Sequence, residues 1–323
     1  MIDWQEFPWD TAEPDPRRER LCRPNHPRRP NCRVEGANLT TKAAPTKDKL
    51  VLWAYNAERG LRLDDQLHAL ANPGMPEPDI VLLSEADRGC SRTGSRNVAR
   101  EFARAFGMYY VYGPEFIELP RIWEPSRQIF PLQSIWRRCE HGNAILSRYP
   151  LGNVRLIRHR DSHDWSEPLQ RFFHVGEPRF GGRMALAADV RIGDRFLRIY
   201  SVHLESGWAA DPLRESEIRE LIDDATSLER AVIIGGDMNC GHYISVLKGE
   251  RESEPVTAAL FAGGYVDAHA ALPVAERITT DSSAVIDLLV GREVRFEVSG
   301  VGSHDVWGGL SDHLPVWSAA RLV

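Results

Sequence analysis

Short apolar runs separated by polar segments recur along most of the chain. They fall at residues 51–55, 80–83, 109–112, 144–146, 184–190, 196–202, 231–234, 285–290 and 314–318. Runs of this length, rich in Val, Ile, Leu and Tyr and bounded by polar residues, are typical of buried strands. The pattern therefore predicts one large sheet or a pair of sheets.

Three segments between these runs have helical periodicity and recognisable ends. Ser95 is the predicted N-cap of a helix that stops at Gly107. Asp211 followed by Pro212 predicts the start of a second helix with an apolar stripe, and residues 255–261 predict a third. Strands outnumber helices and often follow one another directly. This order favours two packed sheets with helices outside them over strict alternation of strand and helix.

A change of composition divides the chain into two parts. Residues 1–48 are rich in Pro and Arg and predict an extended leader, whereas residues 49–323 predict one folded domain. The arginines of the leader could contact phosphates, although a solvated arm is the simpler interpretation. Two long irregular stretches interrupt the domain, at residues 114–140 and 159–182. The first contains Trp123, Phe130 and Trp136, which could line a substrate groove or pack as a flap.

The composition is that of an ordinary soluble globular protein, with 42% apolar and 27% charged residues. No stretch approaches the roughly 18 uninterrupted apolar residues of a membrane helix, and no secretory signal is visible. We therefore expect a cytoplasmic protein, and we expect it to act as a monomer. A net charge of −6 weighs against binding along a long nucleic acid but allows a local basic groove.

The cysteines add to this expectation. Five cysteines without a repeated spacing do not suggest a disulfide framework in a chain of 323 residues, so a reducing compartment is favoured. Cys22, His26 and Cys32 could offer three ligands to zinc, but the close pairing of cysteines that is usual in zinc sites is missing.

The most informative segment is AVIIGGDMN, an apolar run that ends in two glycines, an acid and an amide. Gly235 and Gly236 would let the backbone approach a ligand, and Asp237 and Asn239 would project from the strand end. These features are typical of an active site. For this segment alone, an ordinary turn with the same residues is the alternative.

Other strand ends carry similar residues. Asn56 and Glu58 follow an apolar run at a spacing of two, which in extended backbone points both side chains to one side. Glu85 ends another apolar run, and Asp312 with His313 precedes the last one. Acids and amides at several separate strand ends indicate one shared polar site.

Asp287 lies within AVIDLLVG, a run that contains no other polar side chain. Because a buried unpaired carboxylate is costly, Asp287 should have a partner, and an imidazole is the natural one.

In this order, the segments resemble motifs of the endonuclease/exonuclease/phosphatase superfamily. That superfamily includes deoxyribonucleases, apurinic-site repair endonucleases, neutral sphingomyelinases and inositol-polyphosphate phosphatases. The resemblance extends from about Leu50 to the C-terminus and rests on WAYNAE, IVLLSE, HGNAILSRYPL, YSVHLES, IIGGDMN, VIDLLV and SDHLPV. Each motif is weak alone, but the ordered set is specific. It implies an α/β fold, a four-layer αββα sandwich of two mixed β-sheets flanked by helices.

The resemblance implies a site for Mg²⁺, with Mn²⁺ as the other candidate. Glu85 matches the principal metal ligand, with Asn56, Glu58 and Asp312 near it. Hard oxygen ligands suit such an ion, which can polarise a phosphoryl group. The family often has an aspartate where Glu58 stands, so the contact of Glu58 with the metal is expected to involve water.

The resemblance also implies the catalytic residues. Asp237 would orient or deprotonate the attacking water, and Asn239 would hold the water or the phosphate. His313, oriented by Asp287, would contact the scissile phosphate. His203 matches the histidine that is placed to protonate or stabilise the leaving group in the deoxyribonuclease and sphingomyelinase branches.

Two further residues could contact the phosphate. These are Asn143, for which structural hydrogen bonding is an equal alternative, and Arg183, for which a phosphate contact is the less favoured interpretation. Several residues near the expected cleft have no assigned role: His141, His159, His163, His174, Cys240 and His242.

The expected function is divalent-metal-dependent hydrolysis of a phosphoester, with a phosphodiester as the leading substrate. The substrate could be nucleic acid, phospholipid or a phosphorylated metabolite. A DNA endonuclease should present a basic strip, and a lipid hydrolase an exposed apolar platform. A phosphomonoesterase acting on inositol phosphates would need several converging Lys or Arg. A catalytically inactive binding scaffold is a further alternative, although the expected polar positions are all filled.

Overall fold

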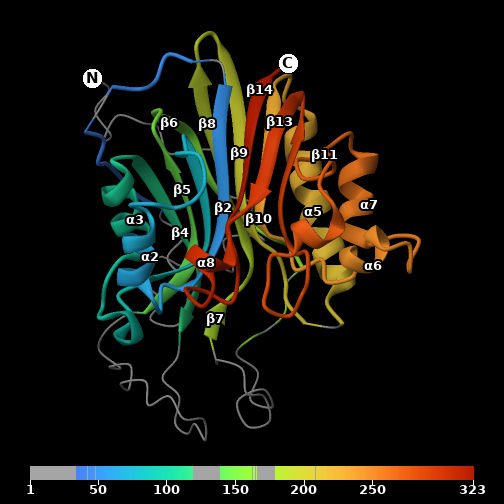
Figure 1. Ribbon diagram of the computed structural model, residues 1–323, viewed down its shortest axis with the longest axis horizontal. Coiled ribbons are helices and arrows are strands. Elements are labelled where there is room, and N and C mark those ends of the chain that lie inside the picture. The colour runs from blue at the N-terminus through green and yellow to red at the C-terminus, as the bar shows by residue number, and fades with distance from the viewer. Residues whose placement is uncertain are drawn as a thin grey trace, which may run out of the picture.

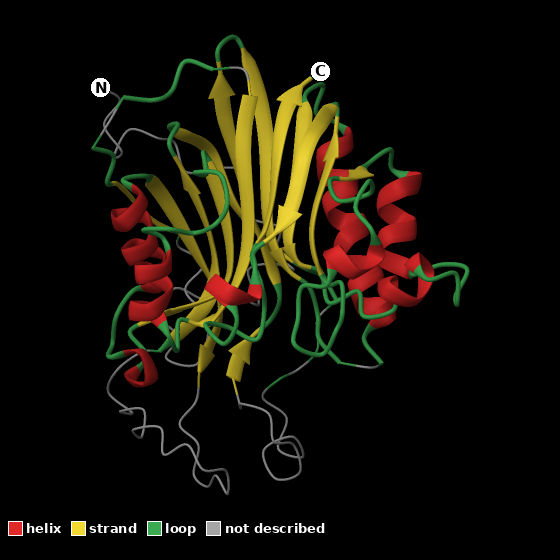
Figure 2. Ribbon diagram, viewed as in Figure 1, coloured by secondary structure: helices red, strands yellow, loops and turns green. Residues whose placement is uncertain are grey.

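Two β-sheets pack face to face with helices on their outer faces (Figures 1 and 2). The structure is a computed structural model, and it describes residues 34–41, 43–47, 49–118, 139–161, 163, 165, 179–207 and 209–323. The predicted four-layer αββα sandwich is confirmed. No helix within these ranges is both long and apolar enough to span a membrane.

The two sheets are mixed, with parallel and antiparallel neighbours. The first has the order β1 (Glu35–Asn38), β4 (Tyr109–Glu118), β5 (Glu140–Ser147), β3 (Ile80–Arg88), β2 (Lys49–Arg59), β14 (Val316–Leu322) and β13 (Val294–Val301), and β7 (Arg179–Gly181) also pairs with β4. The second has the order β11 (Val266–Asp267), β12 (Asp287–Arg292), β10 (Ala231–Asp237), β9 (Arg195–His203), β8 (Met184–Ile192) and β6 (Leu151–Arg158).

Helices cover the outer face of each sheet (Figure 1). The first sheet is covered by α2 (Leu63–Ala69), α3 (Val98–Phe106) and α8 (His304–Trp307). The second is covered by α5 (Asp211–Thr226), α6 (Tyr243–Leu247) and α7 (Pro255–Ala262). Short 3₁₀ helices are η2 (Ser91–Thr93) and η3 (Val274–Arg277).

Strand alternation builds the separate cores. In β2, Leu52 and Ala54 pack between the two sheets, whereas Trp53 and Tyr55 point to the opposite face, beneath the helices. Successive strand residues point to opposite faces, so an uninterrupted apolar run such as LVLWAY can fill two apolar layers at once. This explains why the central strands read as continuous apolar runs in the sequence.

Some element boundaries differ from the sequence predictions. The N-cap of α3 is Asn97, whose side chain accepts a hydrogen bond from the Arg100 backbone N–H, and not Ser95. Ser95 instead has φ 60° in the turn before the helix. Residues Glu35–Asn38 of the predicted leader form β1 at the edge of the first sheet. The leader residues 1–33 and the aromatic residues of 119–138 lie outside the described residues.

The expectation that the cysteines form no disulfide is wrong for one pair. Cys90 and Cys139 are bonded across a sequence separation of 49, while Cys240 is buried and free. The spacing gave no signal because the two residues are brought together by the pairing of β3 with β5. Disulfides persist mainly in oxidising compartments, so this bond weakens the case for a reducing one.

Candidate active site

Three polar residues lie side by side at one end of three neighbouring strands of the second sheet. β10 pairs in parallel with β9 and antiparallel with β12, so that Asp237 stands beside His203 on one side and beside Asp287 on the other. In-register residues of neighbouring strands lie close and point to the same face. The sheet register thus brings together three residues that are far apart in the sequence.

Asp237 is the most heavily hydrogen-bonded carboxylate of this row. Its Oδ2 accepts from Asn56 Nδ2 at 3.0 Å, and its Oδ1 accepts from the Asn239 backbone N–H at 2.9 Å. Burial raises the pKa of this carboxyl above its usual range, while the nearby His313 opposes the rise. A carboxylate whose pKa is shifted towards neutrality is suited to exchange a proton with water. Asn239 has φ 48° and donates its side-chain amide to the Leu204 carbonyl at 2.9 Å.

Asp287 has the imidazole partner that its burial required. His313 Nδ1 lies 2.7 Å from Asp287 Oδ2, and His313 Nε2 lies 3.8 Å from Asp237 Oδ2. Burial disfavours the charged imidazole, but the carboxylates of Asp287, Asp237 and Asp312 together outweigh it and raise the pKa of His313 above its usual value. His313 can therefore carry a positive charge while Nε2 faces the site.

Two of the predicted metal ligands lie at β-bulges. The pairing of β2 with β3 shifts between Asn56 and Arg59, and the pairing of β3 with β5 shifts across Glu85. Glu58 has φ 45° and Glu85 has φ 51°, a left-handed conformation that is strained for these residues. The extended backbone predicted between Asn56 and Glu58 is therefore wrong, and Glu85 lies inside β3 rather than at its end. The bulges turn both carboxylates to the site in a way that simple alternation does not predict.

Glu58, Glu85 and Asp312 form an acidic cluster. Burial and the neighbouring Asp312 raise the pKa of Glu58, and burial together with Glu85 raises that of Asp312. Burial also opposes the charge of Glu85, but Arg59 and three nearby imidazoles hold the pKa of Glu85 well below its usual range. Arg59 Nε lies 3.9 Å from Glu85 Oε2. Clustered carboxylates that repel one another form a set of hard oxygen donors that fits a divalent cation.

His203 links the residues of the two sheets. Its Nε2 lies 4.0 Å from Glu85 Oε1 and 3.5 Å from Asp237 Oδ2. Burial and the Arg183 guanidinium hold the pKa of His203 well below its usual value, so the imidazole is neutral. With His313 near Asp237 as well, Glu85, Asp237 and His313 converge on one region although they come from opposite parts of the chain.

The sequence matches a family model over residues 53–313, and the family is described as the endonuclease/exonuclease/phosphatase family. The chain belongs to this family. The activities in that description are all hydrolyses of phosphoester bonds, and donor sets that suit divalent metals are present at the site. No curated protein sequence matches the chain.

Several solved structures share the fold of the endonuclease/exonuclease/phosphatase family with this chain. A family protein from Beutenbergia cavernae has 16% identity and a TM-score of 0.61, with 85% of this chain and 72% of that chain covered. The human Nocturnin catalytic domain with bound sulfate has 14% identity and a TM-score of 0.58, covering 90% and 98%. D. rerio TDP2 complexed with single-strand DNA product has 16% identity and a TM-score of 0.57, covering 85% and 100%. At these identities the similarity shows the fold alone.

Asn143 and Arg183 are held in a buried network beside this family site. Asn143 Nδ2 donates to Glu115 Oε1 and to the Met184 carbonyl, each at 3.3 Å. Arg183 Nη1 lies 3.3 Å from Glu115 Oε2, and Arg183 Nε lies 3.6 Å from Glu205 Oε1. Both residues make structural contacts here, and contacts with phosphate remain predictions for them.

Glu115, Glu205 and His141 were not predicted as members of the site. Glu115 contacts His203 Nδ1 at 3.8 Å, and His141 lies beside His203 with ring centroids 6.5 Å apart. The histidine in HGNAIL was the available signal for His141, but no partner could be assigned from the sequence. Glu205 lies in the YSVHLES motif two residues after His203 but was assigned no role, and Glu115 lies at the start of the stretch predicted to be irregular.

The other residues without an assigned role have partners elsewhere. His159 Nδ1 lies 3.1 Å from Glu220 Oε2, and His242 Nε2 lies 3.8 Å from Asp211 Oδ2. His163 packs edge-on against Trp165, and Cys240 is buried. His174 lies outside the described residues.

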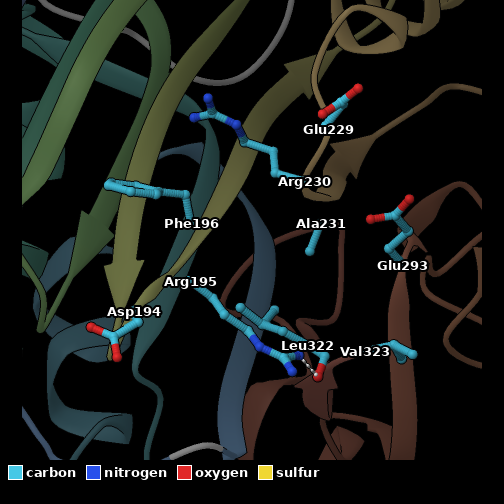
Figure 3. A pocket seen from close by; sticks show the side chains of 9 residues that line it. All are labelled: Asp194, Arg195, Phe196, Glu229, Arg230, Ala231, Glu293, Leu322 and Val323. Carbon is cyan, nitrogen blue, oxygen red and sulfur yellow. Dashed lines mark hydrogen bonds between the residues drawn. The ribbon is translucent and has the colours of Figure 1, made fainter.

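A separate hollow lies at the opposite end of the strands (Figure 3). It has a volume of about 350 Å³, and its lining includes the first residues of β9 and β10, Arg195 and Ala231. Arg195 Nη1 donates to the Leu322 carbonyl at 2.8 Å. His203 and Asp237 end these same two strands, so the length of the sheet separates this hollow from the candidate site.

Proposed function

We propose that this protein is a Mg²⁺-dependent phosphodiesterase, with Mn²⁺ as an alternative ion. The observation that carries the proposal is the contact chain from Asn56 through Asp237 to His313 and Asp287, with His203 adjacent to both Asp237 and Glu85. It joins an acid with a raised pKa, a charged imidazole and a neutral imidazole beside an acidic cluster. These are the groups that phosphoester hydrolysis requires.

Asn56, Glu58, Glu85 and Asp312 are the proposed metal ligands. Their mutual repulsion and their oxygen donors support a hard divalent ion. When bound, Mg²⁺ would polarise the phosphoryl group and offset the charge that develops on it. Asn56 Oδ1 accepts a hydrogen bond from the Glu58 backbone N–H at 3.0 Å, which orients the amide.

Each remaining residue has a proposed role in moving or stabilising charge. Asp237 accepts a proton from the attacking water, because its pKa is raised by burial. His313, charged by virtue of Asp287, stabilises the negative charge that forms on the phosphate. His203 contacts the leaving oxygen and stabilises it, and Asn239 orients the water or the phosphate.

The more specific alternative within this proposal is a DNA endonuclease. One structure with the same fold, D. rerio TDP2, contains a single-strand DNA product. Two arginines near the site lie close to carboxylates, Arg92 to Asp87 and Arg179 to Glu118. Because these carboxylates offset their positive charge, the two arginines do not make the site strongly basic. A short stretch of DNA or a small diester is therefore favoured over a long duplex. Phospholipids and inositol phosphates remain alternative substrates, and a purely binding role remains an alternative function. The test below distinguishes them.

Two further expectations from the sequence belong to this proposal. The chain is expected to act as a monomer. A cytoplasmic location stays a prediction, and the Cys90–Cys139 disulfide counts against it.

The test is hydrolysis of a chromogenic phosphodiester by the parent protein and by Asp237→Asn, with Mg²⁺ and after chelation. We expect chelation to abolish turnover and Asp237→Asn to lower kcat by on the order of 10²–10⁴-fold. Asp224→Asn, on α5 and bonded to Tyr200, is the control with parental rates. Turnover that survives chelation, or equal rates for Asp237→Asn, would refute the mechanism. Rates on single-strand DNA, sphingomyelin and inositol phosphates then rank the substrates.

A further inference from the structure

His141 is a buried histidine that the proposed reaction does not use. It lies on β5 with no exposed surface, and its Nδ1 lies 3.2 Å from Asp87 Oδ1. Among the described residues, its Nε2 has no hydrogen-bond partner. An unsatisfied polar atom in a fully buried side chain is unusual and costly, so its position requires an explanation.

The free nitrogen of His141 belongs to a compact group of potential ligands. Glu85, His141 and His203 each offer one ligand atom, and these atoms all lie within 4.8 Å of one another. Because Nδ1 of His141 faces Asp87, Nε2 is the nitrogen left to bind an ion. Two imidazoles and one carboxylate form the donor set of zinc and related transition metals, whereas Mg²⁺ prefers oxygen alone.

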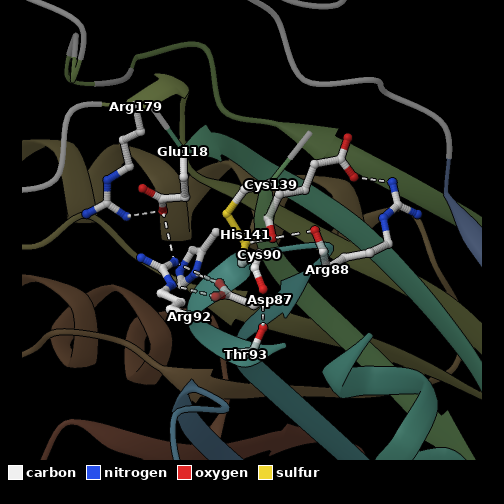
Figure 4. The surroundings of a disulfide bond; sticks show 10 residues. Asp87, Arg88, Cys90, Arg92, Thr93, Glu118, Cys139, His141 and Arg179 are labelled. Atoms are coloured by element: carbon white, nitrogen blue, oxygen red, sulfur yellow. Dashed lines mark hydrogen bonds and ion pairs between the residues drawn. A yellow bond between two sulfur atoms is a disulfide. The ribbon is translucent and has the colours of Figure 1, made fainter. Parts of the chain in front are cut away.

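The surroundings of His141 hold its ring in one orientation (Figure 4). Arg92 donates to both oxygens of Asp87, from Nε at 2.6 Å and from Nη2 at 2.9 Å. The Cys90–Cys139 disulfide joins the segment after Asp87 to the residue two positions before His141. A carboxylate that holds the second nitrogen of a histidine is the usual outer support of a metal-binding imidazole. Asp87, itself fixed by Arg92, provides that support.

We propose that Glu85, His141 and His203 form a second metal site that binds a transition-metal ion of the zinc type. Its donors differ from those of the proposed Mg²⁺ site, with which it shares only Glu85. The two ions therefore compete for this carboxylate. Metal binding at this site does not depend on the hydrolytic reaction, so it can be tested even if the proposed function is wrong.

The test measures Co²⁺ and Zn²⁺ binding directly in full-length protein with excess Mg²⁺. Cys22 and Cys32 are replaced by Ser in the background, because with His26 they could bind zinc independently. Reductant is omitted so that Cys90 and Cys139 remain bonded. We expect one ion per chain, with visible Co²⁺ absorption that is lost when Zn²⁺ is added.

Variants then assign the ion to these residues. His141→Ala should weaken Zn²⁺ binding by on the order of 100-fold, and Asp87→Asn by about 10-fold, because Asp87 acts only through His141. His159→Ala is the matched control, since His159 is also buried and faces a carboxylate through Nδ1 but lies outside the group. Circular dichroism checks the fold of each variant. Zinc affinity of His141→Ala within about threefold of the parent would overturn the site.

X-ray absorption of the zinc-loaded protein that carries only the Cys22→Ser and Cys32→Ser replacements tests the proposal without any substitution of the proposed ligands. Two imidazoles and one carboxylate are expected in the spectrum. A zinc ion without imidazole ligands, or with sulfur ligands, would overturn the proposal, as would the absence of stoichiometric binding.

Discussion

The contact between Asp287 and His313 shows how one buried carboxylate sets the state of the site. Burial opposes the charged imidazole of His313, because the charged form loses its hydration, and Asp287 makes the largest of the carboxylate contributions that raise its pKa. With Oδ2 of Asp287 at 2.7 Å from Nδ1, the charge is stabilised and Nε2 is turned towards Asp237. The pair therefore contributes both orientation and charge.

Asp287→Asn should reduce the free energy of unfolding by about 1.5–3 kcal/mol, since a hydrogen bond to a charged group is weakened. The folded protein raises the pKa of His313. Its stabilisation is therefore fully present below the unfolded pKa of about 6.5 and is lost as pH rises through the folded value. The loss caused by the variant should be larger at about pH 6 than at about pH 10.

Urea unfolding of parent and variant at both pH values measures this difference. Asp194→Asn serves as the control, because its side chain is fully exposed and lies beside the hollow at the opposite end of the strands from His313. If the difference in free energy of unfolding between the parent and Asp287→Asn increases with rising pH, the assigned direction of the pKa shift of His313 is contradicted.

At the scale of the strands, the glycines of β10 have a packing role that the sequence did not predict. A side chain at Gly236, which has φ 138°, would collide with the Val202 backbone carbonyl on β9. A side chain at Gly235 would meet Leu82 and Leu289 at 2.7 Å, in the core between the sheets. The glycines thus permit close packing of β10 against its neighbours, and this packing positions Asp237.

Gly236→Ala should destabilise the protein by about 1–3 kcal/mol, because the backbone of β9 or β10 must move to admit the methyl group. Gly241→Ala is the matched control, since no described atom lies within 4 Å of the methyl group that it adds. Thermal unfolding compares the two variants. Equal melting temperatures for both would show that the strands can separate at Gly236 without cost.

The elements that the sequence predicted are those with simple patterns. The nine apolar runs all became strands, because residues buried on both faces must be apolar throughout. β13 was missed because most of its residues are half-buried or exposed, and β6 because its buried residues do not form a continuous apolar run. Bulges at Glu58 and Glu85 depend on pairing with other strands, so local spacing could not reveal them.

The candidate site was predictable to a similar extent. Residues at strand ends could be selected because polar groups after apolar runs are conspicuous, and Asp237, His203 and Asp287 stand in one register row. His141 could not be selected, since its partners Asp87 and Glu85 lie on a neighbouring strand. The Cys90–Cys139 bond was hidden for the same reason.

At the scale of the whole molecule, the disulfide closes a long loop. Its two cysteines are 49 residues apart, so the bond restricts the unfolded chain considerably. Replacing both Cys90 and Cys139 by Ser should lower the free energy of unfolding by about 2–4 kcal/mol. Chemical unfolding with and without reductant measures the effect. Reductant should destabilise the parent and leave the double variant unchanged, and any effect on the variant would point to another cause.

The acidic cluster should make the metal-free molecule less stable than its metal-bound form. Burial and Asp312 raise the pKa of Glu58, so its charge opposes folding at neutral pH. Mg²⁺ binds only the folded arrangement and should stabilise it by about 2.7 kcal/mol at 100 times its Kd. Glu58→Gln should therefore raise the melting temperature without metal and reduce the rise that Mg²⁺ produces.

Calorimetry with chelator and with Mg²⁺ separates these two effects. Glu229→Gln, at the opposite end of the strands beside the hollow, is the control. It should change neither the melting temperature in chelator nor the rise that Mg²⁺ produces. If Glu58→Gln melts below the parent in chelator, the charge of Glu58 does not oppose folding. If Mg²⁺ still raises its melting temperature as much as that of the parent, Glu58 does not help to hold the ion. The two outcomes are independent because the first concerns repulsion within the cluster and the second concerns binding of the cation that relieves it.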